Sequence, residues 1–206
     1  MVRLQQGKTE RYIRLLTDFF ALFIGKFGSQ TYLDHFNSIQ PGLGLMLLMQ
    51  VWVPRLHSDL PVRTEAKLQV VGLTRVLCDT PAILVDDSGK QIWSQVLAGV
   101  MMIVTNPNAN LSASAASSAT DDGDYEEAEI GYDATYSRLH FASRPSPDPF
   151  PELVDPLMEL VRSLHGLCTS RQTGEIMTLI RHGLQADQKL LVGLESLFQK
   201  AGLNLV

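Results

Sequence analysis

Apolar residues recur every three or four positions through most of the chain, which is the spacing of one face of an α-helix. The first such run predicts a helix over about residues 9–27 and consists of Tyr12, Leu16, Phe20, Phe23 and Phe27. Gly28 then ends this helix, because glycine readily takes the left-handed backbone conformation found at helix ends.

The first predicted helix is also apolar away from that run. Its other faces carry Ile13, Leu15, Phe19, Leu22 and Ile24. A helix that is apolar most of the way round is normally buried between neighbours, yet few residues precede this one to cover its second surface. We therefore expect an exposed hydrophobic face at the N-terminal end, and self-association of the isolated chain through it. Phe19 and Leu22 are the candidates for the outward side of the helix, and Phe20 and Phe23 for the core side.

Further helices follow, separated by short turns that contain proline or glycine. We expect a short helix over about residues 31–38, and an apolar helix over residues 43–53 that closes near Pro54. The next helix is the clearest and has Pro61 in its first turn, where the missing N–H of proline costs nothing. The apolar face of this helix consists of Ala66, Val70, Leu73 and Leu77, and its stop is Asp79-Thr80-Pro81.

The second half of the chain repeats this pattern. A helix that stops at Asn106-Pro107 is marked by Ile92, Val96, Val100 and Ile103. Two late helices are marked by Leu153, Leu157, Leu160, Leu164 and Leu167, and by Leu190, Leu194, Leu197 and Ala201, with a shorter helix over about residues 173–182 between them. No segment outside the loops alternates like a strand, so the predicted class is all-α.

Successive helix pairs with short turns favour a HEAT-repeat α-solenoid, a superhelical stack of antiparallel helix pairs. A compact helical bundle is the alternative on these signals. The stack is interrupted by a segment rich in Asn, Ala and Ser, so we expect HEAT-like repeats over residues 1–105, a mobile loop over 106–130 and further HEAT-like repeats over 131–206.

The predicted loop carries most of the negative charge of the protein. Its acidic set consists of Asp121, Asp122, Asp124, Glu126, Glu127 and Glu129. The formal net charge is −5, and without these six carboxylates it would be −5 + 6 = +1. The acidity therefore belongs to the loop, and the acidic set is a candidate binding site for a basic partner.

Two classes of partner, nucleic acid and membrane, are not indicated by the sequence. No basic tract offers the phosphate-neutralising surface that nucleic-acid binding needs. The longest apolar stretch, Leu43–Val53, is 11 residues long, whereas a membrane span needs about 20. We expect no insertion into a membrane. Cys78 and Cys168 lie 90 positions apart, which is typical of reduced, buried thiols in an intracellular protein.

Each catalytic or metal-binding pattern in the sequence lacks a residue that it requires. Gly7-Lys8-Thr9 resembles the end of a phosphate-binding loop, but the glycine required five positions earlier is replaced by Val2. His165 and Cys168 could share a helical face, but a structural zinc site needs four ligands and no other Cys or His lies nearby. We interpret the pair as neighbouring residues at the edge of the core. We expect no enzymatic activity, no metal and no cofactor.

In several segments the exact order of residues is more informative than the helical periodicity. In order, they are Arg11-Tyr12-Ile13, Phe19-Phe20, Gly25-Lys26-Phe27-Gly28, Asn37-Ser38-Ile39-Gln40-Pro41, Trp52-Val53-Pro54, the run from Thr74 to Ala82, Gly131-Tyr132, Ser137-Arg138-Leu139 and Phe141-Ala142. As a series they resemble the C-terminal portion of the exportin-2 family, also called the cellular apoptosis susceptibility (CAS) proteins. The stretch 190–206 is similar to the helix on which those proteins terminate.

This resemblance implies a HEAT-repeat arch and a role in transport. Members of the family carry importin-α out of the nucleus together with RanGTP and release it in the cytoplasm, so importin-α and RanGTP are the implied partners, and nucleus and cytoplasm the implied locations. The chain resembles only the last fifth or so of such a receptor. The alternatives are a helical-repeat scaffold, or a truncated remnant without independent transport activity.

Overall fold

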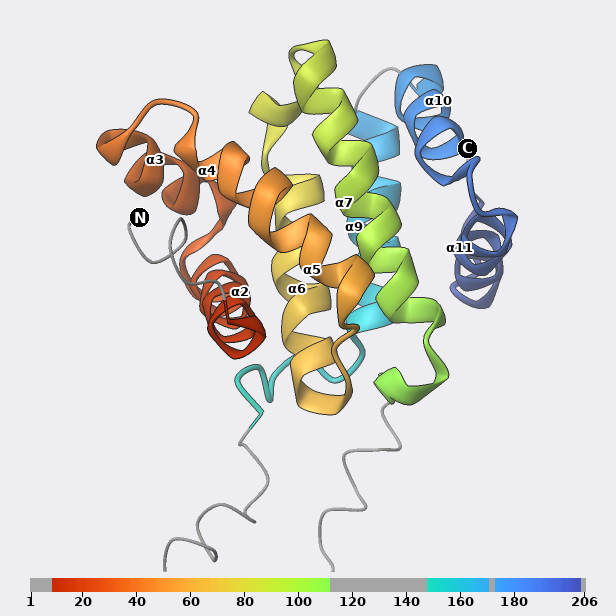
Figure 1. The fold of residues 1–206 in the computed structure, drawn as a ribbon. Coiled ribbons are helices and arrows are strands. Elements are labelled where there is room, and N and C mark those ends of the chain that lie inside the picture. Colours follow the sequence, from red (N-terminus) through yellow and green to blue (C-terminus); the bar gives the residue numbers. More distant parts are fainter. Residues whose placement is uncertain (1–8, 112–147, 171–172, 205–206) are drawn as a thin grey trace, which may run out of the picture.

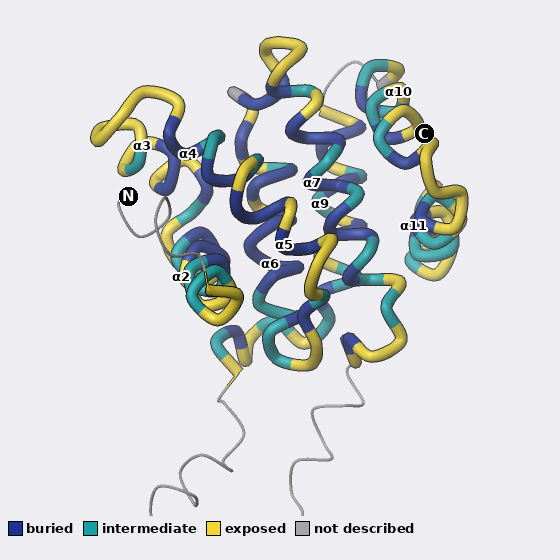
Figure 2. The backbone as a smooth tube through the Cα atoms, in the orientation of Figure 1, coloured by how far each residue is buried: buried dark blue, intermediate teal, exposed yellow. Residues whose placement is uncertain are grey.

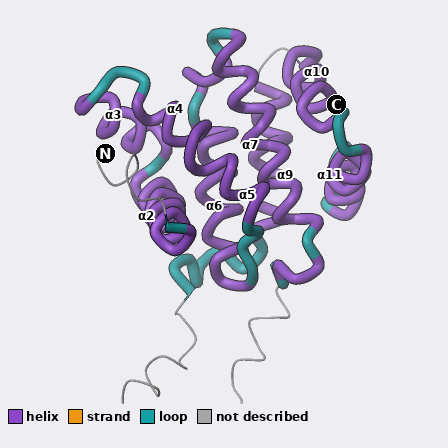
Figure 3. The backbone as a smooth tube through the Cα atoms, viewed as in Figure 1, coloured by secondary structure: helices purple, strands orange, loops and turns teal. Residues whose placement is uncertain are grey.

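The computed structural model describes residues 9–111, 148–170 and 173–204 of the chain. Within these ranges the chain forms helices joined by turns (Figure 3), which confirms the all-α prediction. Among the described helices, none is long and apolar enough to cross a membrane. The acidic set and the segments from Gly131 to Ala142 that carry part of the family resemblance lie outside the described residues.

The elements follow one another closely along the chain. They are α2 (Glu10–Phe27), α3 (Ser29–Ile39), α4 (Leu43–Leu47), the π-helical turn η1 (Leu48–Trp52), α5 (Val53–Ser58), α6 (Arg63–Asp79), the 3₁₀ turn η2 (Pro81–Leu84), α7 (Asp87–Thr105), the 3₁₀ turn η3 (Pro107–Ala109), α9 (Pro156–Ser170), α10 (Thr173–Leu184) and α11 (Gln188–Lys200).

The helices α6 and α7 form a central antiparallel pair, with α2 on one side and α10 and α11 on the other (Figure 1). Helix α6 packs against α2 on one side and α9 on the other, which makes a layer α2–α6–α9. Helix α7 likewise packs between α5 and the pair α10 and α11. Because each helix pair contacts only its neighbours in the stack, the arrangement is that of HEAT-like repeats.

The centre of the stack contains the predicted apolar faces. Ala66, Val70 and Leu73 of α6 are completely buried, and so are most of the predicted apolar residues of α7. Figure 2 shows this burial concentrated along α6 and α7, whereas the outer turns of α3, α10 and α11 are exposed. The described segments before residue 112 and after residue 147 contribute to one continuous core.

Helices α2 and α6 approach each other very closely. A Cβ atom added at Gly72 of α6 would lie 2.7 Å from Cα and 3.0 Å from O of Ala21 in α2. Such distances are below normal contact, so this approach requires glycine at position 72. Gly25 has a similar role in α2, where the buried ring of Phe150 occupies the space that a Cβ would take.

The predicted end of the third helix near Pro54 is wrong. The helical path runs from α4 through η1 into α5 and ends at Ser58. Pro54 lies in the first turn of α5, directly after the π-helical turn. The hydrogen-bond register changes at the π-helical turn, so the missing N–H of Pro54 does not break the helix there.

Two other helix starts also differ from the prediction. Helix α6 begins at Arg63, after the extended residue Val62, so Pro61 precedes the helix. Helix α9 begins at Pro156, so Leu153 lies in the preceding turn. Outside the two helices, Pro61 is buried and Leu153 is partly buried, so an apolar residue next to a helix need not belong to it.

Candidate partner-binding surface

Helix α2 forms the outer member of the α2–α6–α9 layer. Thr9 begins it, because its backbone is extended and its Oγ1 accepts a hydrogen bond from the N–H of Tyr12. Gly28 ends it with φ at 90°, a backbone conformation that favours glycine. The side toward α6 carries Thr17, Phe20, Ala21, Ile24 and Gly25, all buried.

The opposite side of α2 is apolar and exposed. Leu15, Phe19 and Leu22 expose 61%, 53% and 37% of their surface, whereas Phe20 exposes 1%. The outward position expected for Phe19 and Leu22 is therefore confirmed, as is the core position of Phe20. Phe23 is only partly buried, between the two sides.

The predicted apolar run of α2 identifies the core side only in part. Phe27 is 64% exposed, although the periodicity placed it with the core residues. Ile24, which the periodicity placed on another face, is completely buried. The buried side is therefore rotated around the helix from the predicted one, because the position of α6 selects which of several apolar faces is covered.

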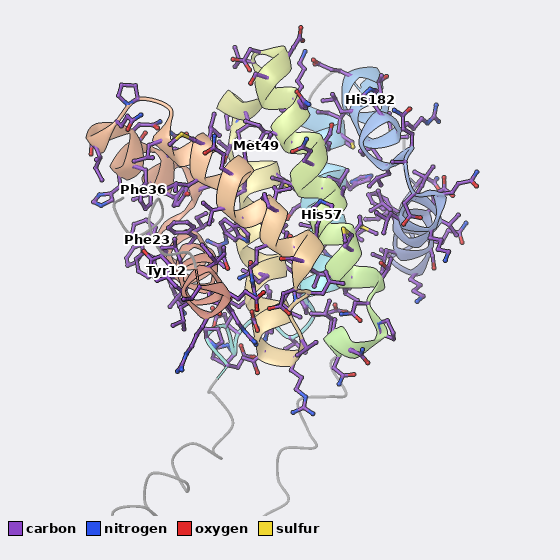
Figure 4. The ribbon with its side chains drawn as sticks, viewed as in Figure 1. Tyr12, Phe23, Phe36, Met49, His57 and His182 are labelled. Carbon is purple, nitrogen blue, oxygen red and sulfur yellow. The ribbon has the colours of Figure 1, made fainter. Side chains whose placement is uncertain are left out.

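Aromatic rings continue the exposed side towards α3. The ring of Phe23 lies 6.0 Å from that of Phe19 and 5.0 Å from that of Phe27, centroid to centroid. It also lies 6.3 Å from the imidazole of His35 in α3. Figure 4 shows Tyr12, Phe23 and Phe36 together on this side of the molecule, opposite His182 of α10. Of these rings, Phe19 and Phe27 are exposed and Phe23 is partly buried, and exposed aromatic side chains that lie together are typical of a protein contact surface.

A chain of polar groups lies beneath this surface and joins three elements. Trp52 Nε1 in η1 donates a 2.6 Å hydrogen bond to Oε1 of Gln69 in α6, and Gln69 Nε2 donates a 2.7 Å bond to Oδ1 of Asp18 in α2. Trp52 and Gln69 are both completely buried. Since both nitrogens meet an acceptor, the burial of these polar side chains is compensated.

Arg55 of α5 extends this network. Its side chain is 4% exposed and binds the carboxylate of Glu65 in α6. Arg55 Nη1 also lies 3.8 Å from Oδ1 of Asp18, and the exposed Arg14 of α2 binds Glu65 as well. The network therefore clamps α2, α5 and α6 to one another. The helical periodicity of the sequence does not predict these ion pairs, because the paired residues are up to 51 positions apart.

The network shifts the protonation of Asp18. Burial, together with the nearby negative charge of Glu65, raises the pKa of Asp18 to about 6, although the hydrogen bond from Gln69 and the charges of Arg55 and Arg14 oppose the rise. The hydrogen bond to Glu65 raises the pKa of Arg14. The geometry indicates a structural clamp, since the charged groups of the three helices pair with one another.

The other end of the stack has a shallow hollow between α10 and α11. It is lined mainly by the polar residues Thr178, Arg181, His182, Gln185 and Gln188. The hydroxyl of Thr178 donates a 2.7 Å hydrogen bond to O of Gly174, so it is engaged by the backbone of its own helix. In the described part of the chain there is no group of three His, Cys, Asp or Glu residues placed to hold a metal ion.

The remaining candidates from the sequence are the His165–Cys168 pair, the cysteines and the acidic set. His165 and Cys168 lie in α9, and Cys168 is buried. Cys78 and Cys168 are free thiols, and burial raises the pKa of both. The acidic set lies outside the described residues.

The family resemblance is confirmed by comparison with known proteins. Residues 1–193 match the family model described as the C-terminus of CAS/CSE proteins. Exportin-2 of Xenopus laevis is 30% identical over 208 residues, which cover 99% of this chain and 20% of that protein. Exportin-2 of Mus musculus and of Homo sapiens are 27% and 26% identical over 207 residues, with the same coverage.

The chain thus spans about a fifth of the length of the curated relatives it matches. No solved structure matches it. The family assignment therefore comes from the sequence match, and the helical stack agrees with it. Because the family model covers nearly the whole chain, the protein belongs to the CAS/CSE family.

Proposed function

We propose that this chain acts as the C-terminal part of a nuclear export receptor, which binds importin-α with RanGTP and returns it to the cytoplasm. The match of residues 1–193 to the family is the observation that supports this proposal. The similar relatives are named Exportin-2, and the proposed locations are accordingly the nucleus and the cytoplasm.

The mechanism relies on shape and surface. A helical stack buries its core only between neighbouring repeats, so small rotations between repeats change its curvature at low cost. Two partners that favour the same curvature then bind cooperatively, with a coupling of about 1–3 kcal/mol. In this proposal the chain needs no catalytic residue, because GTP hydrolysis on the partner changes the affinity.

Two surfaces serve partners in this proposal. The acidic set, from Asp121 to Glu129, attracts a basic partner, and this attraction weakens as the salt concentration rises past about 0.1 M. The exposed side of α2 makes the isolated chain self-associate weakly at high protein concentration. Light scattering over a range of protein concentrations measures that association.

A pull-down with importin-α tests the transport role. Immobilised chain is incubated with importin-α alone, with Ran carrying a non-hydrolysable GTP analogue, and with both. We expect retention of importin-α to increase when Ran is present. Retention of neither protein would favour the alternative of a scaffold or a remnant without independent transport activity.

A further inference from the structure

A short segment from the second half of the chain is docked on helices α2 and α6. It consists of Asp148, Pro149 and Phe150, and we call these three residues the docked segment. A turn follows it and leads into α9, which begins at Pro156. Figure 1 shows this part of the chain, in turquoise, running from the side of α2 to the start of α9.

The ring of Phe150 has a site of its own on α2. Phe150 is 2% exposed, and a Cβ atom added at Gly25 would overlap its Cζ. The ammonium group of Lys26 lies over the ring, 4.7 Å from its centroid, which is a favourable cation–π distance. Although Phe150 is buried, it does not belong to the continuous core that the described helices form.

The polar groups of the docked segment are bound by Lys67 of α6. Lys67 Nζ donates a 2.8 Å hydrogen bond to O of Phe150 and lies 2.5 Å from Oδ2 of Asp148. The second carboxylate oxygen of Asp148 accepts a 2.9 Å hydrogen bond from the N–H of Phe150. The Lys67 side chain is only 15% exposed, so its charge is poorly solvated and a carboxylate partner is favoured. An aromatic ring and a carboxylate two positions before it therefore hold the segment in place.

We propose that Gly25, Lys26 and Lys67 form a binding site for peptide segments in which phenylalanine follows aspartate by two positions. The docked segment is an internal ligand of this site, and a partner protein that presents the same pattern displaces it. This inference is independent of the proposed role with importin-α and Ran.

The docked segment has the properties of an exchangeable ligand. Phe150 is the single buried residue between positions 148 and 155, whereas Glu152 and Val154 are exposed. Because Phe150 lies outside the continuous core, its release does not open that core. Pro149 and Pro151 restrict the backbone on both sides of the ring, and a ligand that is restricted before binding loses less entropy when it binds.

The covalent link to α9 gives the internal ligand an advantage over a free peptide. Such a link keeps the segment near its site at an effective concentration of the order of millimolar. A free peptide with the same residues must compete with it, so we expect weak binding to the natural chain. Variants that weaken or remove the internal ligand should bind the peptide more tightly.

A fluorescent peptide with the sequence of residues 148–153 provides the test, with binding to the full chain measured by anisotropy. Phe150→Ala empties the ring site, so this variant should bind the peptide at least ten-fold more tightly than the natural chain. The same peptide with alanine in place of phenylalanine should not bind. A peptide with asparagine in place of aspartate should bind several-fold more weakly, and this difference should shrink at high salt.

A second variant leaves the buried ring in place. Asp148→Ala removes a carboxylate that is 37% exposed, so the fold should be retained, but the internal ligand loses its ion pair with Lys67. We expect at least three-fold tighter binding of the peptide, which carries its own aspartate. This comparison decides the proposal if Phe150→Ala does not fold, as circular dichroism would show.

Gly25→Ala assigns the binding to the ring site. Combined with Phe150→Ala, it places a Cβ where the ring of the peptide would lie, so binding should be lost. Gly166→Ala in the same background is the matched control, because a Cβ there meets nothing within 4 Å, and it should leave binding unchanged. Peptide binding that survives Gly25→Ala would overturn the proposal. So would folded Asp148→Ala and Phe150→Ala chains that bind the peptide no better than the natural chain, because Phe150 would then be a fixed part of the fold.

Discussion

Replacing Gly72 by alanine tests the close packing of α2 on α6. The added Cβ would lie 2.7 Å from Cα, 3.0 Å from Cβ and 3.0 Å from O of Ala21. Two of these are backbone atoms, so no side-chain rotation can relieve the contact, and α2 must move away from α6. Overpacking of this kind costs about 1–3 kcal/mol, whereas alanine is favoured over glycine in a helix by about 1 kcal/mol. We expect a net loss of up to about 2 kcal/mol in the free energy of unfolding.

Gly166→Ala is the matched control for this experiment. Gly166 lies within α9, and a Cβ added there would meet nothing within 4 Å. The same substitution should therefore stabilise the protein by about 0.5–1 kcal/mol. Urea unfolding followed by circular dichroism in the far ultraviolet measures both variants. In thermal unfolding, each kcal/mol corresponds to roughly 2–4 °C for a chain of this size.

The combination with Ala21→Gly adds a further check. It removes the contact with Cβ of Ala21 but leaves those with its backbone atoms, so only some of the lost stability should return. If Gly72→Ala stabilised the protein as much as Gly166→Ala, the helices could not be in the contact described, and the reasoning would be refuted.

Two further predictions concern the polar network. Glu65→Ala leaves the buried Arg55 without its main partner, so we expect a loss of about 3 kcal/mol in urea unfolding. Lys90→Ala, which breaks a surface pair, should cost less than about 1 kcal/mol. Between pH 4 and 6, folded Asp18 keeps a proton that the unfolded chain has released, so its contribution to stability falls as the pH rises. Asp18→Asn should remove this pH dependence, so its effect on the free energy of unfolding should be more favourable at pH 7 than at pH 4 by about 1–2 kcal/mol. This value is reduced for solvent screening, because 24% of the Asp18 side chain is exposed. An equal effect at both pH values would contradict the raised pKa.

The candidate surface was predictable in outline but not in orientation. Excess apolar residues in α2 correctly indicated an exposed face with Phe19 and Leu22 on it. They could not distinguish the buried Ile24 from the exposed Phe27. On a helix that is apolar nearly all round, no side stands out from the sequence, and the covered side depends on where α6 lies.

The sequence by itself determined the helices and the family. Apolar spacing and proline or glycine stops placed α6 and α7 to within a few residues, because these signals act over a few positions of the chain. Local signals do not determine which distant residues meet. The continuation of the helix through Pro54, the clamp between Arg55 and Glu65, and the approach of Gly72 to Ala21 were decided only by the tertiary structure. Each depends on contacts between separate helices, whose relative positions are set by packing of the whole core.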